Sequence, residues 1–119
     1  MISDQLWKVS SDKKLVNKGW DWQFQNETWV LPSVGSEGDI EHSTSGQVLG
    51  LRRDRTKSGT RVVMESRDKP KSEEQTWLIG EKDENGFFVI TNPKSALVLS
   101  NKVRRFPKST RISTIISGN

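Results

Sequence analysis

Short runs of alternating apolar and polar residues, each bounded by turn-forming residues, recur about every ten positions along the chain. The clearest run is residues 20–25, where aromatic and polar residues alternate, so the rings are expected to face one side of a strand. Helical periodicity is absent. The pattern predicts an all-β protein of about 11–12 strands.

Two hairpins are predicted around short turns. One pairs residues 39–42 with 47–51, and Gly46 supplies a positive φ in its turn. The other pairs residues 87–91 with 96–100. Residues 35–38 are expected to form a turn, and the highly charged residues 66–74 a solvated loop.

One plan recurs three times: a tryptophan, a turn, and a strand in which a polar residue follows aliphatic ones. The tryptophans are Trp7, Trp29 and Trp77, and the polar positions hold Asn17, His42 and Asn92. A unit of roughly 35 to 48 residues is too short to bury its own apolar face, so the copies must share a core. We therefore expect three pseudo-repeats about a pseudo-threefold axis.

The first copy is shorter than the other two. Between Phe24 and Trp29 it lacks the hairpin that the others contain, so residues 28–31 are expected to form its third strand, and the register of Trp29 is left open. We expect one domain, residues 1–119, as is usual for this length. Its lobes are expected at approximately residues 13–35, 36–82 and 83–119, with 4–9 completing the third.

The amino-acid composition limits what the core can be built from and which functional groups the chain can use. The 119 residues are 31% hydrophobic and 29% charged, with five tryptophans and four phenylalanines, so a few large rings provide much of the core. The chain has no cysteine, which excludes disulfides, thiolate metal sites and a cysteine nucleophile. No run approaches the roughly 18 apolar residues of a membrane helix, and no signal peptide is recognisable. We expect a soluble protein without a membrane span, either cytoplasmic or a domain excised from a longer protein.

The sequence contains no motif that indicates an enzyme. His42 is the sole histidine, and no phosphate-binding loop, zinc spacing or triad motif is present. We therefore expect no catalytic residue, no metal site and no cofactor. His42 is expected to fill the polar position after Ile40 and to hydrogen-bond the turn that follows.

The segments around the three tryptophans carry a family resemblance. Gln5-Leu6-Trp7, Glu27-Thr28-Trp29 and Gln75-Thr76-Trp77 resemble the Gln-x-Trp (QxW) signature of ricin-B-type lectins. Residues 40–49 resemble the Ile-x-Asn-x-x-Ser-Gly-Lys-x-Leu hairpin of the same repeats, and residues 59–63 resemble their third strand. The resemblance spans nearly the whole chain and implies a ricin B-like β-trefoil of twelve strands in three lobes.

The resemblance also implies where a sugar would bind. In the family, each site combines a carboxylate near the end of a lobe's first hairpin, an aromatic platform on the next strand, and an amide before the tryptophan. Polar groups select hydroxyl geometry, and a flat ring stacks on the apolar face of a sugar. In the first lobe the candidate carbohydrate-binding residues are Trp20, Asp21, Gln25 and Asn26.

The other two lobes depart from this pattern. In the second lobe the carboxylate position holds Gly50, the platform position falls on Met64 or Glu65, and the amide position holds Glu74. In the third lobe the carboxylate position holds Ser100, and no aromatic residue lies between residues 112 and 116.

Basic residues gather in two segments that threefold symmetry would relate. The candidate polyanion-binding residues are Arg52, Arg53, Arg55, Lys57, Arg104, Arg105 and Lys108. Guanidinium groups bind sulfate or phosphate well, but a net charge of only +4 leaves a solvated hairpin as the alternative interpretation. Nucleic acid is not expected as a partner, because Phe106 is the only aromatic residue interleaved with these cations.

These observations predict a non-enzymatic, lectin-like module whose partner is a glycan or glycoconjugate. Two alternatives stay open: a trefoil that binds a sulfated polyanion or a protein through its basic loops, and a structural trefoil without a sugar site. The sequence leaves the sugar, the number of working lobes and the oligomeric state unassigned.

Overall fold

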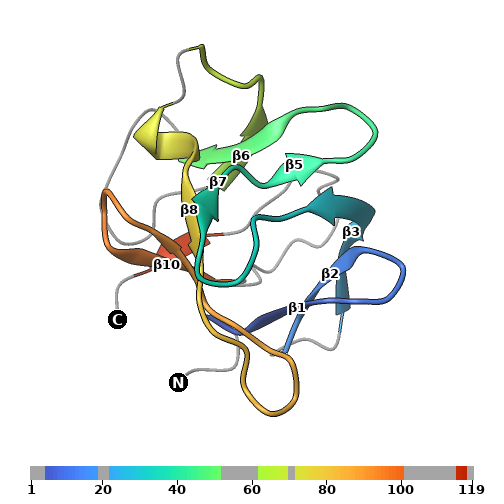
Figure 1. Cartoon of the computed structure of the whole chain (residues 1–119). Helices are drawn as coiled ribbons and strands as arrows, with labels where there is room; N and C mark the ends of the chain where they lie inside the picture. The colour runs from blue at the N-terminus through green and yellow to red at the C-terminus, as the bar shows by residue number, and fades with distance from the viewer. Residues whose placement is uncertain (1–4, 19–21, 52–61, 70–71, 101–114, 118–119) are drawn as a thin grey trace.

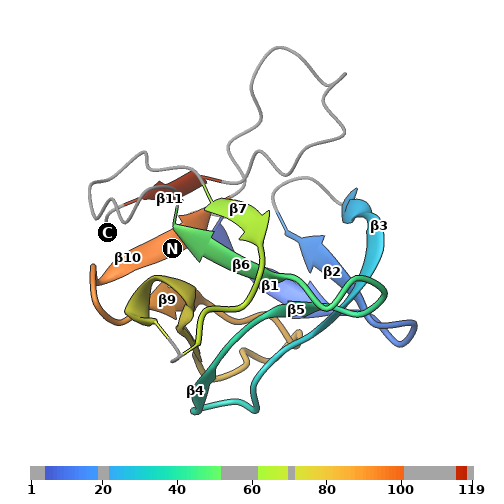
Figure 2. The ribbon, with the colours of Figure 1, turned by 90° about the horizontal axis from the view of Figure 1, so that it is seen from above.

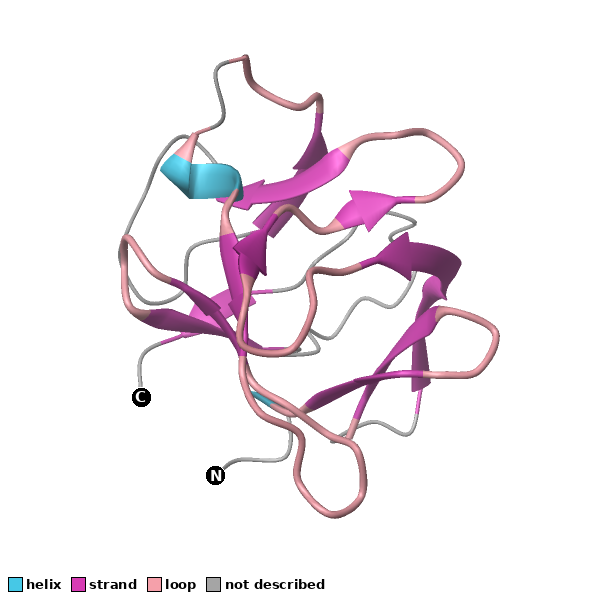
Figure 3. Cartoon of the chain, viewed as in Figure 1, coloured by secondary structure: helices cyan, strands magenta, loops and turns pink. Residues whose placement is uncertain are grey.

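The structure, a computed structural model, describes residues 5–18, 22–51, 62–69, 72–100 and 115–117, with side chains for all of these except 22–27 and 115–117. Apart from short 3₁₀ turns, its regular elements are β-strands (Figure 3). They are β1 (Trp7–Val9), β2 (Lys14–Asn17), β3 (Trp22–Val30), β4 (Glu37–Gly38), β5 (Glu41–His42), β6 (Val48–Leu51), β7 (Val62–Glu65), β8 (Trp77–Ile79), β9 (Ile90–Asn92), β10 (Leu97–Ser100) and β11 (Ile115–Ser117). One sheet has the order β1-β2-β3-β5-β6-β7 and the other β11-β10-β9-β8-β4.

Each of the three tryptophans of the repeat lies between two neighbouring strand segments. Trp7 pairs with Asn17 on one side and with Phe88 on the other. Trp29 pairs with His42, and its N–H donates to the Lys13 carbonyl. Trp77 pairs with Gly38, and its strand, β8, pairs on the other side with β9. These pairings close a ring of strand segments about an approximate threefold axis (Figures 1 and 2). This ring, with hairpins attached to it, is the β-trefoil that the sequence predicts.

The core of the molecule is built on the same three indole rings. Trp7 and Trp77 are fully buried and Trp29 is 2% exposed. A buried indole usually places its N–H on an acceptor. The Trp7 Nε1 donates to the Leu99 carbonyl at 2.9 Å, and the Trp77 Nε1 donates to the Leu49 carbonyl at 3.0 Å. Each bond ties a barrel strand to a hairpin strand, so the tryptophans fix the hairpins against the barrel.

In the second and third copies, the polar position that follows the tryptophan contacts a turn. Asn92 is fully buried, and its Oδ1 accepts hydrogen bonds from the Ser95 N–H at 3.0 Å and the Ser95 Oγ at 2.9 Å. His42, 7% exposed, lies with its Nδ1 2.6 Å from the Ser45 Oγ, and its ring centroid is 5.2 Å from that of Trp29. His42 therefore takes the predicted position and contacts the turn.

The structure differs from the sequence-based expectations in three places. The first lobe has no separate strand at residues 28–31, because β3 continues unbroken to Val30, and Trp29 faces His42. Residues 37–38 form β4 instead of part of a turn, because Gly38 pairs with Trp77. The end of the charged stretch, Glu73–Gln75, forms a 3₁₀ helix and the strand begins only at Trp77.

In the part of the chain that the structure describes, no helix has the length and apolar character needed to cross a membrane.

Candidate functional site

The carboxylate position of the second lobe lies in the middle of β6, at Gly50. Gly50 is buried and pairs with Val63 of β7. A Cβ atom at this position would stand 2.6 Å from the Glu65 Oε2 and 2.9 Å from the Glu65 Cδ. The carboxylate of Glu65 thus occupies the space that a side chain at residue 50 would need.

Gln75 holds this carboxylate in place. Gln75 is 1% exposed, and its Nε2 donates to the Glu65 Oε2 at 2.6 Å and to the Ser66 carbonyl at 2.9 Å. Its Oε1 accepts the Asp68 N–H at 2.9 Å. Glu65 is half-buried, and its second oxygen, Oε1, has no hydrogen-bond partner within the described residues. The second lobe therefore presents an oriented carboxylate with one oxygen available as an acceptor.

The family resemblance assigns the platform position to Met64 or Glu65 and does not identify Glu65 as the acid. The side chains of a strand alternate between its two faces, and Met64 pairs with Leu49 and packs against the core. Glu65 consequently points to the other face, toward Gly50. The sequence did contain a signal for this arrangement. The acid position holds a glycine, Gly50, and a glutamate, Glu65, follows two residues after Val63, the residue that pairs with Gly50.

Glu74, at the amide position of the second lobe, is engaged by a lysine. The Lys94 Nζ donates to the Glu74 Oε1, and this hydrogen bond is the main reason that the pKa of Glu74 lies below its usual value. A second ion-pair network joins the Arg67 Nε to the Asp39 Oδ2 at 2.7 Å and the Arg67 Nη2 to the Glu41 Oε2 at 3.4 Å. The hydrogen bond to Asp39 is also the main cause of the raised pKa of Arg67.

The carboxylate position of the third lobe holds a serine. Ser100, which takes the carboxylate position, is fully buried at the end of β10. A buried hydroxyl at this point cannot meet a ligand from solvent. Within residues 83–100 and 115–117, no carboxylate lies beside Ser100 as that of Glu65 lies beside Gly50.

The carbohydrate site expected in the first lobe lies largely outside the residues that the structure describes. Trp20 and Asp21 lie outside the described residues; Gln25 and Asn26 lie in β3, but their side chains are not described. All the basic residues proposed to bind a polyanion also lie outside the described ranges: Arg52, Arg53, Arg55, Lys57, Arg104, Arg105 and Lys108.

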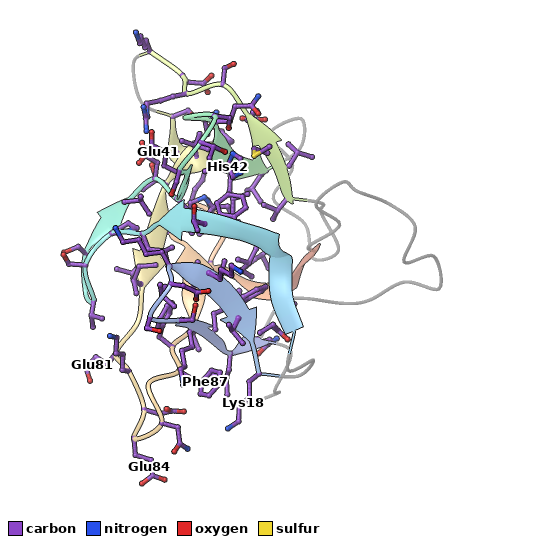
Figure 4. The ribbon with its side chains drawn as sticks, turned by 90° about the vertical axis from the view of Figure 1, so that its right-hand side faces the viewer. Lys18, Glu41, His42, Glu81, Glu84 and Phe87 are labelled. Carbon is purple, nitrogen blue, oxygen red and sulfur yellow. The ribbon has the colours of Figure 1, made fainter. Side chains whose placement is uncertain are left out.

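Among the described side chains, no group of three or more histidine, aspartate or glutamate residues is arranged to hold a metal ion. His42 and Glu41 lie near one end of the molecule, whereas Glu81, Glu84, Phe87 and Lys18 lie toward the other (Figure 4).

Comparison with known proteins agrees with the β-trefoil fold. The chain is similar over 98% of its length to a designed protein described as "Crystal structure of designed 3-fold symmetric protein, ThreeFoil", with 16% sequence identity, 91% coverage of that chain and a TM-score of 0.56. At this identity the similarity shows the fold alone. No curated protein matches the chain. A family model described as "Ricin-type beta-trefoil lectin domain-like" matches residues 21–114, so the chain belongs to the ricin-type β-trefoil lectin domain-like family.

Proposed function

We propose that the chain is a non-catalytic carbohydrate-binding module. The observation that carries the proposal is the carboxylate of Glu65, which stands over Gly50 at the acid position of the second lobe. Family membership supports both parts of the proposal, because the family is described as lectin domain-like and its domains are generally non-catalytic.

In the second lobe, Glu65 accepts hydrogen bonds from sugar hydroxyls through its Oε1, while Gln75 fixes its Oε2 at 2.6 Å. Fixing one oxygen orients the carboxylate before binding, which reduces the ordering cost of association. Hydrogen bonds to a charged acceptor contribute roughly 1.5–3 kcal/mol each. In the first lobe, Trp20, Asp21, Gln25 and Asn26 remain the proposed contacts, with the tryptophan as the stacking platform.

A glycan array with the full chain tests this proposal. We expect binding that a neutral monosaccharide competes away. Glu65→Gln keeps the shape of the side chain and its contact with Gln75 but removes the charge, and should weaken second-lobe binding by about tenfold or more. Asp21→Ala and Asn26→Ala should weaken first-lobe binding in the same way.

The matched control is Glu81→Gln, which removes the same charge at an exposed loop position. It should leave binding unchanged. An array without hits, or hits that none of the three site variants weakens, would refute the carbohydrate proposal and leave the structural trefoil as the remaining class.

A second candidate, polyanion binding, has its own supporting observation. Each basic segment lies between the two strands of an antiparallel pair, the first between β6 and β7 and the second between β10 and β11. The segments therefore connect the same two kinds of strand in two lobes. This function requires binding to a heparin-like sulfated chain that collapses between roughly 0.1 and 0.5 M salt, whereas binding of a neutral sugar persists.

A further inference from the structure

In the second and third lobes, the strand that follows the turn after His42 or Asn92 is paired on both edges. β6 pairs with β5 on one edge and, over four residue pairs, with β7 on the other. β10 pairs with β9 on one edge and, over three residue pairs, with β11 on the other. In both lobes the covering strand is antiparallel and begins with two β-branched residues, Val62-Val63 in β7 and Ile115-Ile116 in β11.

The first lobe has the same turn but no covering strand. Asn17 pairs with Trp22, and Asn92 pairs with Leu97 at the same spacing. Gln23 of β3 therefore corresponds to Val48 of β6, and residues 24–26 follow it in sequence as Leu49–Leu51 follow Val48. After Gln23 the register between β2 and β3 shifts, so that the next pair is Lys14 with Thr28. β3 then continues directly to Trp29, and no strand in the described part of the chain pairs with the second edge of residues 23–26.

The register identifies the backbone groups on this edge. In the second lobe the His42 N–H donates to the Gln47 carbonyl at 2.8 Å and the Leu49 N–H donates to the Ile40 carbonyl at 3.0 Å. Gln47 and Leu49 thus direct their backbone groups toward the barrel strand, and Val48 and Gly50 direct theirs toward β7. By correspondence, Gln23 and Gln25 direct theirs toward the edge that no described strand covers.

Two further features favour pairing at this edge. β3 runs across the side of the molecule that faces the viewer in Figure 4. Residues 22–26 contain no lysine, arginine, proline or charged residue of any kind. Natural proteins usually protect an open sheet edge with such residues, because unpaired N–H and C=O groups recruit other strands.

We propose that residues 23–26 of β3 form a docking site for an extended segment of a partner polypeptide, which adds to the sheet as an antiparallel strand. The segment takes the place that β7 and β11 take in the other lobes. Backbone hydrogen bonds between the segment and β3 supply the affinity. A pair of β-branched residues in the segment, like those in β7 and β11, supplies the specificity. The docking stretch includes Gln25 and Asn26, which are also proposed sugar contacts, but strand pairing uses their backbone groups and sugar binding uses their side chains.

A peptide with the sequence of residues 61–66, which contains β7, is a suitable probe for the full chain. Amide hydrogen exchange is read at Gln23 and Gln25, with Val48 and Gly50 as internal references that β7 already covers. We expect the peptide to slow exchange at Gln23 and Gln25 by at least about tenfold and to leave the references unchanged.

Two matched controls isolate strand pairing. Val63, which pairs with Gly50, directs its N–H toward the partner strand, so a peptide carrying Val63→Pro should have no effect. In the protein, Gln23→Pro removes one donor from the open edge, and Gln23→Lys adds a charge if the proline variant does not fold; each should abolish the response.

Three outcomes would overturn the proposal. Gln23 and Gln25 could exchange as slowly as Val48 and Gly50 in the free monomer, which would mean that the chain already covers this edge. The Val63→Pro peptide could protect the edge equally well. The protein could instead dimerise with these amides protected and no peptide bound, which would assign the edge to a second copy of the chain.

Discussion

Gly50 and Glu65 illustrate how one residue sets the conformation of another across a sheet. An alanine at residue 50 would place its Cβ 2.6 Å from the Glu65 Oε2, so the carboxylate must move and its bond to Gln75 must break. We expect Gly50→Ala to lower the free energy of unfolding by about 1.5–3 kcal/mol, the usual contribution of a hydrogen bond to a charged group. Chemical denaturation measures this change.

The same substitution in a Glu65→Ala background provides the control. Without the carboxylate, the new methyl group meets little more than the Gln75 Cγ at 3.2 Å, and alanine restricts the unfolded chain more than glycine does. Gly50→Ala should then be neutral or slightly stabilising. An equal cost in both backgrounds would show that Glu65 is not the group that requires glycine at this position.

Ala96 occupies a backbone conformation that favours glycine. Its φ is 60°, and the corresponding residue of the second-lobe turn, Gly46, has a φ of 74°. Residues with a Cβ atom are disfavoured in this left-handed region by roughly 1 kcal/mol. Ala96→Gly should therefore raise the free energy of unfolding, by about 0.5 kcal/mol after the extra freedom of glycine in the unfolded chain is subtracted. Gly46→Ala is the reciprocal control and should destabilise; a loss of stability on Ala96→Gly would contradict the argument.

At the scale of elements, the turn between β8 and β9 depends on an ionised aspartate. The Asp83 Oδ1 accepts the N–H groups of Phe87 at 2.9 Å and Asn85 at 2.8 Å, and the Lys18 Nζ lies 5.4 Å from the centroid of the Phe87 ring. These contacts, led by the Phe87 hydrogen bond, hold the pKa of Asp83 below its usual value. The charged form is therefore the one that stabilises the turn.

The pH dependence of this turn follows from the direction of the shift. Because the pKa is lower in the folded state, the stabilisation is fully present above the pKa of the unfolded chain and is lost as the pH falls through the folded value. A carbon-detected NMR titration should place the Asp83 transition below that of a model aspartate, with the Asn85 and Phe87 amides shifting at the same pH. Asp83→Asn should remove the transition from both amides; an Asp83 carboxyl that titrates at its usual value would contradict the assignment.

The strands and turns show which parts of the element pattern are readable from the sequence. The hairpin of β5 and β6 and the positive φ of Gly46 follow from local rules, because turn chemistry and alternation act within a few residues. β4 does not follow from them, because Gly38 becomes a strand residue only by pairing with Trp77, which is distant in sequence. Glu65 was missed for a related reason: its role depends on a cross-strand neighbour, and family position alone assigned it elsewhere.

At the scale of the whole molecule, the fold is a closed ring whose last joint is made by the first strand. Trp7 exchanges backbone hydrogen bonds with Phe88, at 2.9 and 2.8 Å, and pairs on its other side with Asn17. Its indole also donates to the Leu99 carbonyl. β1 therefore contacts both the start of the first lobe and the hairpin of the third, and completes the barrel between them.

Deletion of residues 1–9 should consequently abolish cooperative folding and not merely weaken one lobe. The deletion removes a fully buried tryptophan, and truncation of such a ring alone costs about 3–5 kcal/mol, a large part of the stability of a domain of this size. It also opens two barrel edges, which water and other chains can then attack. Deletion of residues 1–4, which leaves β1 intact, is the matched control and should preserve the thermal unfolding transition. A 10–119 chain that unfolds cooperatively within a few degrees of the full chain would mean that β1 does not close the barrel.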